Sequence, residues 1–301
     1  MTKKNFLCAS SLLLLAIIIT AFLLRIWGIT FDLPHVSHPD EPNEVHRALR
    51  LGAGNFEIER VGKGGYYYLL FIEYGVFFII LKLLGIITSV KGFMLYFFKD
   101  PTYFYIIGRT TTVFIGTLNV WLTYLIGKKV KGENVGLIAA IFMAFSNVNV
   151  LHAHYITVDV PMTACVLATV YFALKIYETD QLRNYILAGF FSALSIMTKI
   201  SSAPIILVIG LAHFFKYKNY TNKRFVNKNL LVYLIFTLLI YFIGEPGALL
   251  KLFNFLKANL YENGSTLVEQ NARVGVGITF LIRYYFSATI SALGWPLFLI
   301  V

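Results

Sequence analysis

Charged side chains are scarce in this sequence, because Asp, Glu, Lys and Arg make up 14% of its 301 residues while 58% are hydrophobic. Soluble globular domains carry about 25% charged residues, so this composition excludes an ordinary soluble domain. The mean hydropathy of +0.71 is typical of a polytopic membrane protein whose helices cross the bilayer. The expected fold class is therefore an all-α polytopic membrane protein.

Cysteine is also nearly absent, since the chain contains only Cys8 and Cys165, and both lie in apolar runs. This number excludes a disulfide framework and a cysteine metal centre, and it favours simple packing for both side chains. The net charge of +11 does not indicate a nucleic-acid partner, because the cations gather in short segments between apolar runs. Such a pattern is typical of membrane topology.

The apolar runs predict where the chain crosses the membrane. The first begins shortly after Lys3 and Lys4, lacks a cleavage signal, and is interpreted as a retained anchor with a cytoplasmic N-terminus. The last is apolar to its final residue, so we expect the sequence to be the N-terminal part of a longer protein. The predicted spans are residues 6–24, 110–127, 135–158, 160–174, 185–198, 200–215, 230–244 and 276–301.

Residues 66–88 form a further apolar run but contain Glu73 and Lys82, each costing about 2.5–3.5 kcal/mol near the bilayer centre. If this run does not cross, the basic residues 128–131 and 216–228 share the cytoplasmic side with the N-terminus, as the positive-inside rule favours. We therefore predict a helix in the outer interface. Residues 28–109 then form the first extracytoplasmic loop of a single domain that covers residues 1–301.

Adjacent carboxylates follow the first span, in the sequence His38-Pro39-Asp40-Glu41-Pro42. Carboxylates at a membrane surface need to face water, a cation or a reacting group. A solvated turn is the alternative, because proline fixes φ and the acids can stay hydrated. In the predicted topology these acids share the outer face with Asp159 and Lys199, which makes a common site feasible.

Asp159 lies at the outer mouth between two predicted spans, two residues before Pro161. It is either part of the site or a carboxylate that favours a helix start. Lys63, in a glycine-rich turn, and Lys199, between two short spans, are candidate phosphate ligands. Each lysine could equally be a surface or interfacial cation.

Several histidines, namely His35, His38, His46, His152 and His154, are expected near the same face. Imidazole and carboxylate groups suit a divalent metal, but no metal-binding spacing organises these residues, so no metal ligand is assigned. The acids and cations together suit a donor sugar on a phosphate leaving group. One carboxylate that takes the proton of an acceptor hydroxyl would then suffice for displacement with inversion.

The order of these motifs resembles integral-membrane glycosyltransferases with the GT-C fold. The branch is similar to dolichyl-phosphate-mannose–protein mannosyltransferases and to the lipid A aminoarabinose transferase, as in glycosyltransferase families 39 and 83. The resemblance is carried by residues 38–42, 63–68, 108–109 at the predicted opening of a span, 154–161, 198–199, 244–248 and 294–297.

This resemblance implies a hexosyl or pentosyl transferase with membrane-lying helices in its first outer loop. It implies a polyprenyl-phosphate sugar donor, a lipid, glycan or protein acceptor, and a plasma (inner) membrane location with the active site outside. Asp40 would be the general base, with Glu41 and Asp159 completing the acidic site. Lys63 and Lys199 would contact the donor phosphate, while His38, His154 and Tyr155 would contact donor or acceptor.

The main alternative is a transporter or flippase of lipid-linked sugars that makes no bond. Such proteins place polar residues on broken helices near the bilayer midplane and contain inverted repeats. Here the acids are predicted at the outer mouth, and no repeat is evident, so the transferase is preferred.

Overall fold

The computed structural model describes residues 3–54, 64–217 and 227–245, with side chains from residue 9 onward. These residues form helices and contain no strand. The helices are α1 Lys3–Ile26, α2 Glu41–Gly52, α3 Gly64–Leu83, α4 Val90–Lys99, α5 Thr102–Lys131, α6 Glu133–Phe145, α7 Asn147–His152, α8 Asp159–Glu178, α9 Leu182–Thr198, α10 Ile205–Tyr217 and α11 Lys228–Gly244, with a 3-10 turn at Ile200–Ser202.

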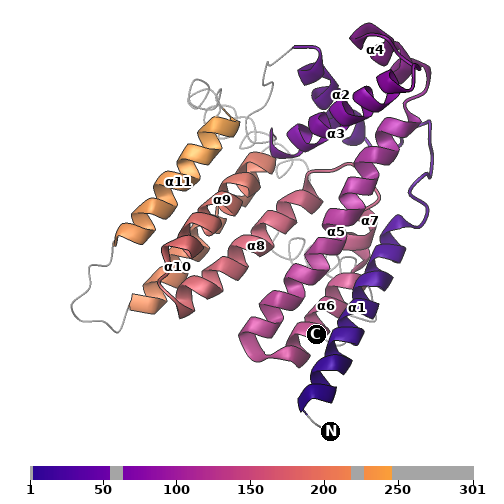
Figure 1. Cartoon of the computed structure of the whole chain (residues 1–301). Helices are drawn as coiled ribbons and strands as arrows, with labels where there is room; N and C mark the ends of the chain where they lie inside the picture. The colour runs from indigo at the N-terminus through magenta and orange to yellow at the C-terminus, as the bar shows by residue number, and fades with distance from the viewer. Residues whose placement is uncertain (1–2, 55–63, 218–226, 246–301) are drawn as a thin grey trace, which may run out of the picture.

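Most of these helices form a bundle in which successive helices run in opposite directions (Figure 1). Helices α1, α5 and α6 share one core, around Val120 and Ala140, and α8 to α11 share another, around Tyr185 and Ile209. Contacts between α5 and α8 join the two groups. Five helices, namely α1, α3, α5, α8 and the segment Ile200–Tyr217, are long and apolar enough to cross a membrane. This part of the chain confirms the predicted all-α polytopic membrane protein.

Helices α2, α3 and α4 gather at the end of the bundle where α1 ends and α5 begins (Figure 1). Their core is aromatic, and Phe93, Phe97 and Phe104 pack within it. The chain enters and leaves the α2–α4 group at the same end of the bundle. Helix α3 therefore does not take the chain to the opposite end. Helix α3 itself is long enough to span a bilayer, and its interfacial placement stays a prediction.

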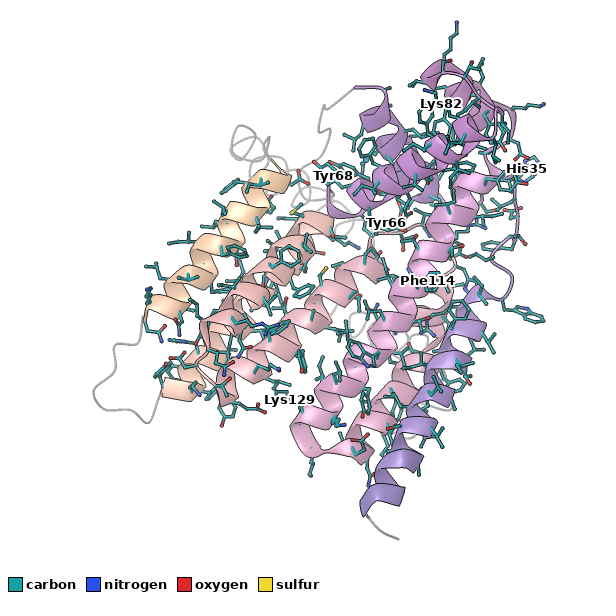
Figure 2. All side chains as sticks on the ribbon, viewed as in Figure 1. His35, Tyr66, Tyr68, Lys82, Phe114 and Lys129 are labelled. Carbon is teal, nitrogen blue, oxygen red and sulfur yellow. The ribbon has the colours of Figure 1, made fainter. Side chains whose placement is uncertain are left out.

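The opposite end of the bundle carries the N-terminus and a set of lysines. Lys129, in the last turn of α5, lies at that end, far from Tyr66, Tyr68 and His35 (Figure 2). Lys129 pairs with Glu178, the last residue of α8, and Lys216 in α10 donates to the Glu178 carbonyl. Lys128, Lys129 and Lys131 in the last turn of α5 and Lys216 in the last turn of α10 therefore share one end of the molecule, whereas residues 218–226 lie outside the described part.

Two predicted segments differ from the structure. The run at 135–158 is not one helix, because α6 ends at Phe145 and Ser146 has extended backbone. Arg25 explains the break, since its guanidinium donates to the carbonyls of Met143 and Ala144 and occupies acceptors that a longer helix would use. The Arg25 side chain is fully buried.

The other difference concerns Gly108 and Arg109, which were expected to open a span. Helix α5 begins at Thr102, so both residues lie almost two turns inside it. Pro101 directly precedes the helix, and a proline before or at a helix start is favourable because its missing N–H would be unpaired there. This places Arg109 inside the protein instead of at its surface. The predicted span at 276–301 lies outside the described residues.

Candidate active site

Asp40 occupies the N-cap position of α2, immediately before Glu41 and Pro42 in the first turn. Pro42 suits this position because its fixed φ matches a helix start. The Asp40 side chain makes no capping hydrogen bond. It is exposed, and among the described residues it has no hydrogen-bonding or ion-pair partner. Asp40 therefore presents an accessible carboxylate at the end of the bundle that carries α2.

Glu41, one residue later, has the opposite environment because its side chain is completely buried. Its two oxygens accept a fork of hydrogen bonds from Arg109, Nε to Oε1 at 2.8 Å and Nη2 to Oε2 at 2.8 Å. The backbone N–H of Ile156 also donates to Oε1, at 3.0 Å. A bidentate, charge-assisted pair of this kind is both strong and directional. The arrangement leaves Glu41 as a link between α2, α5 and the segment before α8.

Arg109 also holds the chain segment that leads from α1 to Asp40. Its Nη1 donates to the carbonyls of Ile29 and Phe31, each at 2.9 Å. The guanidinium carbon lies 4.6 Å from the centre of the Phe31 ring, a cation–π geometry. The predicted site did not include Arg109. The signal available in the sequence was a lone arginine in an otherwise apolar stretch.

The residues after α7 pack against this same segment. The Tyr155 ring lies 4.3 Å from the His38 ring and 5.6 Å from the Phe31 ring, measured between centroids. His38 accepts a hydrogen bond from the Asp40 backbone N–H at its Nδ1, at 3.3 Å. His154 contacts two carbonyl oxygens, of Val150 at 2.8 Å and Trp27 at 2.9 Å. Thus His38 lies beside Asp40 and Tyr155 packs on His38, whereas both His154 nitrogens contact carbonyl oxygens within the protein.

Asp159 and Lys199 form an ion pair, with 2.6 Å between Lys199 Nζ and Asp159 Oδ1. Asp159 is the first residue of α8, and Lys199 is the C-cap of α9, so antiparallel packing of these helices brings the two together. The side chains retain 36% and 37% of their exposure. Both predicted residues therefore reach the end of the bundle that carries Asp40, and both remain accessible to a ligand.

The start of α3 packs on this end as well. A Cβ at Gly65 would lie 2.5 Å from the Thr198 hydroxyl, so only glycine allows this approach. Tyr68 donates its hydroxyl proton to the carbonyl of Gly244, at 2.9 Å. Lys63, the other predicted phosphate ligand, lies outside the described residues.

The histidines do not form one cluster. His46 packs on Phe97 in the α2–α4 group, while His152 is in α7 and His38 is beside Tyr155. Within the described ranges, no group of three or more His, Cys, Asp or Glu side chains could hold a metal ion.

The sequence of this chain is similar to a known protein family. Residues 104–245 match the sequence model of the dolichyl-phosphate-mannose-protein mannosyltransferase family. The match covers just under half of the chain and includes Arg109, Asp159 and Lys199, whereas Asp40 and Glu41 precede it. No curated protein matches the chain in a sequence search. The match confirms the predicted resemblance to GT-C glycosyltransferases, and over residues 104–245 this multi-pass membrane protein is similar to the dolichyl-phosphate-mannose-protein mannosyltransferase family.

Proposed function

We propose that the protein transfers a sugar from a polyprenyl-phosphate-linked donor to an acceptor hydroxyl, with Asp40 as general base. The observation that carries this proposal is the contrast at the start of α2. The Asp40 side chain is exposed and has no partner among the described residues, whereas Glu41 is buried against Arg109. Of the two adjacent carboxylates, only Asp40 is available to take a proton. The family match supports glycosyl transfer as the reaction class.

In the proposed reaction the acceptor oxygen attacks the anomeric carbon of the donor sugar. The new carbon–oxygen bond forms while the bond from this carbon to the phosphate oxygen breaks, and Asp40 receives the hydroxyl proton. The configuration inverts in this single displacement. The polyprenyl phosphate needs no proton in order to leave, so one carboxylate suffices.

Cations are needed where the leaving phosphate gains charge. Lys199 is suited to this role because its Asp159 partner is one-third exposed, and exposed ion pairs contribute only about 0–1 kcal/mol. A phosphate can therefore replace Asp159 as the partner of Lys199, or bind Lys199 together with it, with little loss of free energy. Lys63 is proposed as a second cation on the basis of the resemblance alone.

The reaction is proposed to occur on the extracytoplasmic face of the plasma (inner) membrane. Lys129, Lys131 and Lys216 lie at the end of the bundle opposite the candidate site, and positive residues favour the cytoplasmic side. A cysteine at His35 should react with an impermeant maleimide in intact cells, and one at Lys131 should not. The reverse labelling would place the site in the cytoplasm.

The transfer reaction can be tested with a radiolabelled polyprenyl-phosphate sugar and membranes that contain the full chain. Asp40→Asn should lower the rate about 10²–10⁴-fold, the range that a positioned general base contributes. Asp32→Asn is a matched control, because Asp32 is an exposed carboxylate in the same segment with φ of 58°, which asparagine tolerates. Unchanged transfer by Asp40→Asn, or movement of the donor across the bilayer without transfer, would reject the proposal.

A further inference from the structure

Three helix ends meet beside the Asp159–Lys199 pair, and a glycine lies at each contact between them. Helices α9 and α11 end there, at Thr198 and Gly244, and α3 begins there, at Gly64 (Figure 1). Lys199 is the C-cap of α9 and directly follows the contact between α9 and α3. The proposed transfer reaction uses Lys199 but assigns no role to the residues that meet around it.

The first two residues of α3 approach the other two helix ends so closely that no side chain fits between them. A Cβ on Gly64 would overlap the carboxyl group of Glu245, the C-cap of α11. A Cβ on Gly65 would lie 2.5 Å from the Thr198 hydroxyl oxygen and 3.3 Å from the Thr198 backbone nitrogen. Glycine permits both approaches, because any larger residue would push α3 away from the ends of α9 and α11.

The ends of α9 and α11 are in similarly close contact with each other. A Cβ on Gly244 would overlap the side chain of Met197, in the last turn of α9. Tyr68, in the second turn of α3, donates its hydroxyl proton to the Gly244 carbonyl at 2.9 Å. Carbonyls in the last turn of a helix lack an intrahelical donor, so this hydrogen bond also caps α11. Helices α3 and α11 thus contact Thr198 and Met197, the two residues that precede Lys199.

Glu245 adds an electrostatic contact to this junction. Its side chain is fully buried, and its carboxyl group lies against the first residue of α3. The start of a helix carries a partial positive charge, so a carboxylate is favourable there. The end of α11 is therefore joined to α3 by a carboxyl group as well as by the hydrogen bond of Tyr68.

We propose that this junction fixes the position of Lys199 and that Gly65 and Tyr68 are positioning residues of the donor-phosphate site. The inference rests on the proposed function, in which Lys199 contacts the donor phosphate. Lys199 has extended backbone and follows the last residue of α9, so the placement of Thr198 determines where the Lys199 side chain starts. A misplacement of about 1 Å, even by a distant substitution, can cost about 10²-fold in activity.

Gly65→Ala would disturb the junction at one defined contact. To restore ordinary contact distances, either α3 or Thr198 has to move by about 1 Å. Thr198→Ala removes the hydroxyl that this Cβ would meet, so the double variant Gly65→Ala/Thr198→Ala should relieve the clash. Gly75→Ala is the matched control, because Gly75 lies in the same helix and a Cβ there would meet no atom within 4 Å.

The experiment measures the dissociation constant of a short-chain polyprenyl phosphate without a sugar, by isothermal titration calorimetry on the full detergent-solubilised chain. Gly65→Ala and Lys199→Gln should each raise this constant about tenfold or more, as loss of a hydrogen bond to a charged group does. The variant that combines them should raise it no further, because Gly65 acts through Lys199. Gly65→Ala/Thr198→Ala should recover most of the affinity, and Gly75→Ala should bind like the wild type. Tyr68→Phe should raise the constant up to about tenfold.

Two results would overturn the inference. The first is wild-type affinity in Gly65→Ala, including the case in which only its melting temperature falls. The second is an equal loss of affinity when Gly65→Ala is introduced into the wild type and into Lys199→Gln. If Gly65→Ala does not fold, Tyr68→Phe in the same two backgrounds decides between the same outcomes. A wild-type chain that does not bind the phosphate would reject the proposed function together with this inference, whereas wild-type binding with unaffected variants would reject the inference alone.

Discussion

The ion pairs Glu41–Arg109 and Asp159–Lys199 lie at the same end of the bundle but differ in their exposure. Both side chains of the first pair are 0% exposed, whereas those of the second are 36% and 37% exposed. Breaking a buried pair by removing one partner costs about 3–5 kcal/mol, whereas an exposed pair contributes about 0–1 kcal/mol. The first pair therefore maintains the geometry of the site, and the second can exchange its partners during a reaction.

The largest effect should come from breaking the buried pair. Arg109→Met leaves the Glu41 charge uncompensated and removes the donors to the Ile29 and Phe31 carbonyls. We expect a loss of about 3–5 kcal/mol of unfolding free energy, measured by denaturation of the detergent-solubilised protein. Arg109→Lys should recover part of this loss, because lysine restores the charge without the planar fork. Wild-type stability of Arg109→Met would contradict the role assigned to the buried pair.

A substitution of Arg25 tests the contribution of hydrogen bonds to helix-end carbonyls separately from that of charge pairing. Like Arg109 it is fully buried, but its hydrogen bonds within the described part of the chain are to the carbonyls of Ala21, Met143 and Ala144. Arg25→Met should cost about 1–3 kcal/mol, the penalty for leaving buried acceptors unpaired. The same denaturation assay tests this, and a loss as large as that of Arg109→Met would show that capping alone accounts for the stabilisation.

The exposed pair should affect binding more than stability. Lys199→Gln is expected to change the unfolding free energy by at most about 1 kcal/mol while it raises KM for the polyprenyl-phosphate sugar. Asp159→Asn keeps Lys199 in place and serves as the comparison variant, with KM and melting temperature measured for both. A large fall in stability with an unchanged KM would identify the pair as structural.

His38 should produce the smallest effect. His38→Phe retains a ring that can pack on Tyr155 but loses the Nδ1 acceptor for the Asp40 N–H. An exposed hydrogen bond of this kind contributes about 0.5–1.5 kcal/mol, so we expect at most about a tenfold fall in transfer rate. His38→Asn, which can still accept a hydrogen bond, should fall less, and equal losses in the two variants would point to the stacking instead.

The sequence predicted much of the architecture because membrane helices have strong local signals. The apolar runs anticipated α1, α8, α9 and α11, and Asp159, two residues before Pro161, begins α8 as a carboxylate that favours a helix start would. The break at Ser146 was missed because its cause, Arg25, is more than a hundred residues away. No local pattern records such a contact.

The candidate site was predicted only in part, for the same reason. Asp40 and Glu41 are equivalent in the sequence, and their different environments depend on Arg109, 68 residues further along the chain. Asp159 and Lys199 were predicted as separate contributors, whereas the packing of α8 on α9 makes them a pair. The sequence identified which acids and cations could form the site. Which carboxylate is exposed and which residues pair with one another became clear only from the tertiary contacts.

The most direct test of this division compares Asp40→Asn with Glu41→Gln by thermal denaturation and by sugar transfer. We expect Asp40→Asn to melt like the wild type and to lose transfer, because its carboxylate supports no described contact. Glu41→Gln should melt at a markedly lower temperature, because Arg109 loses its counter-charge. Wild-type transfer by Asp40→Asn, together with a wild-type melting temperature for Glu41→Gln, would contradict the account.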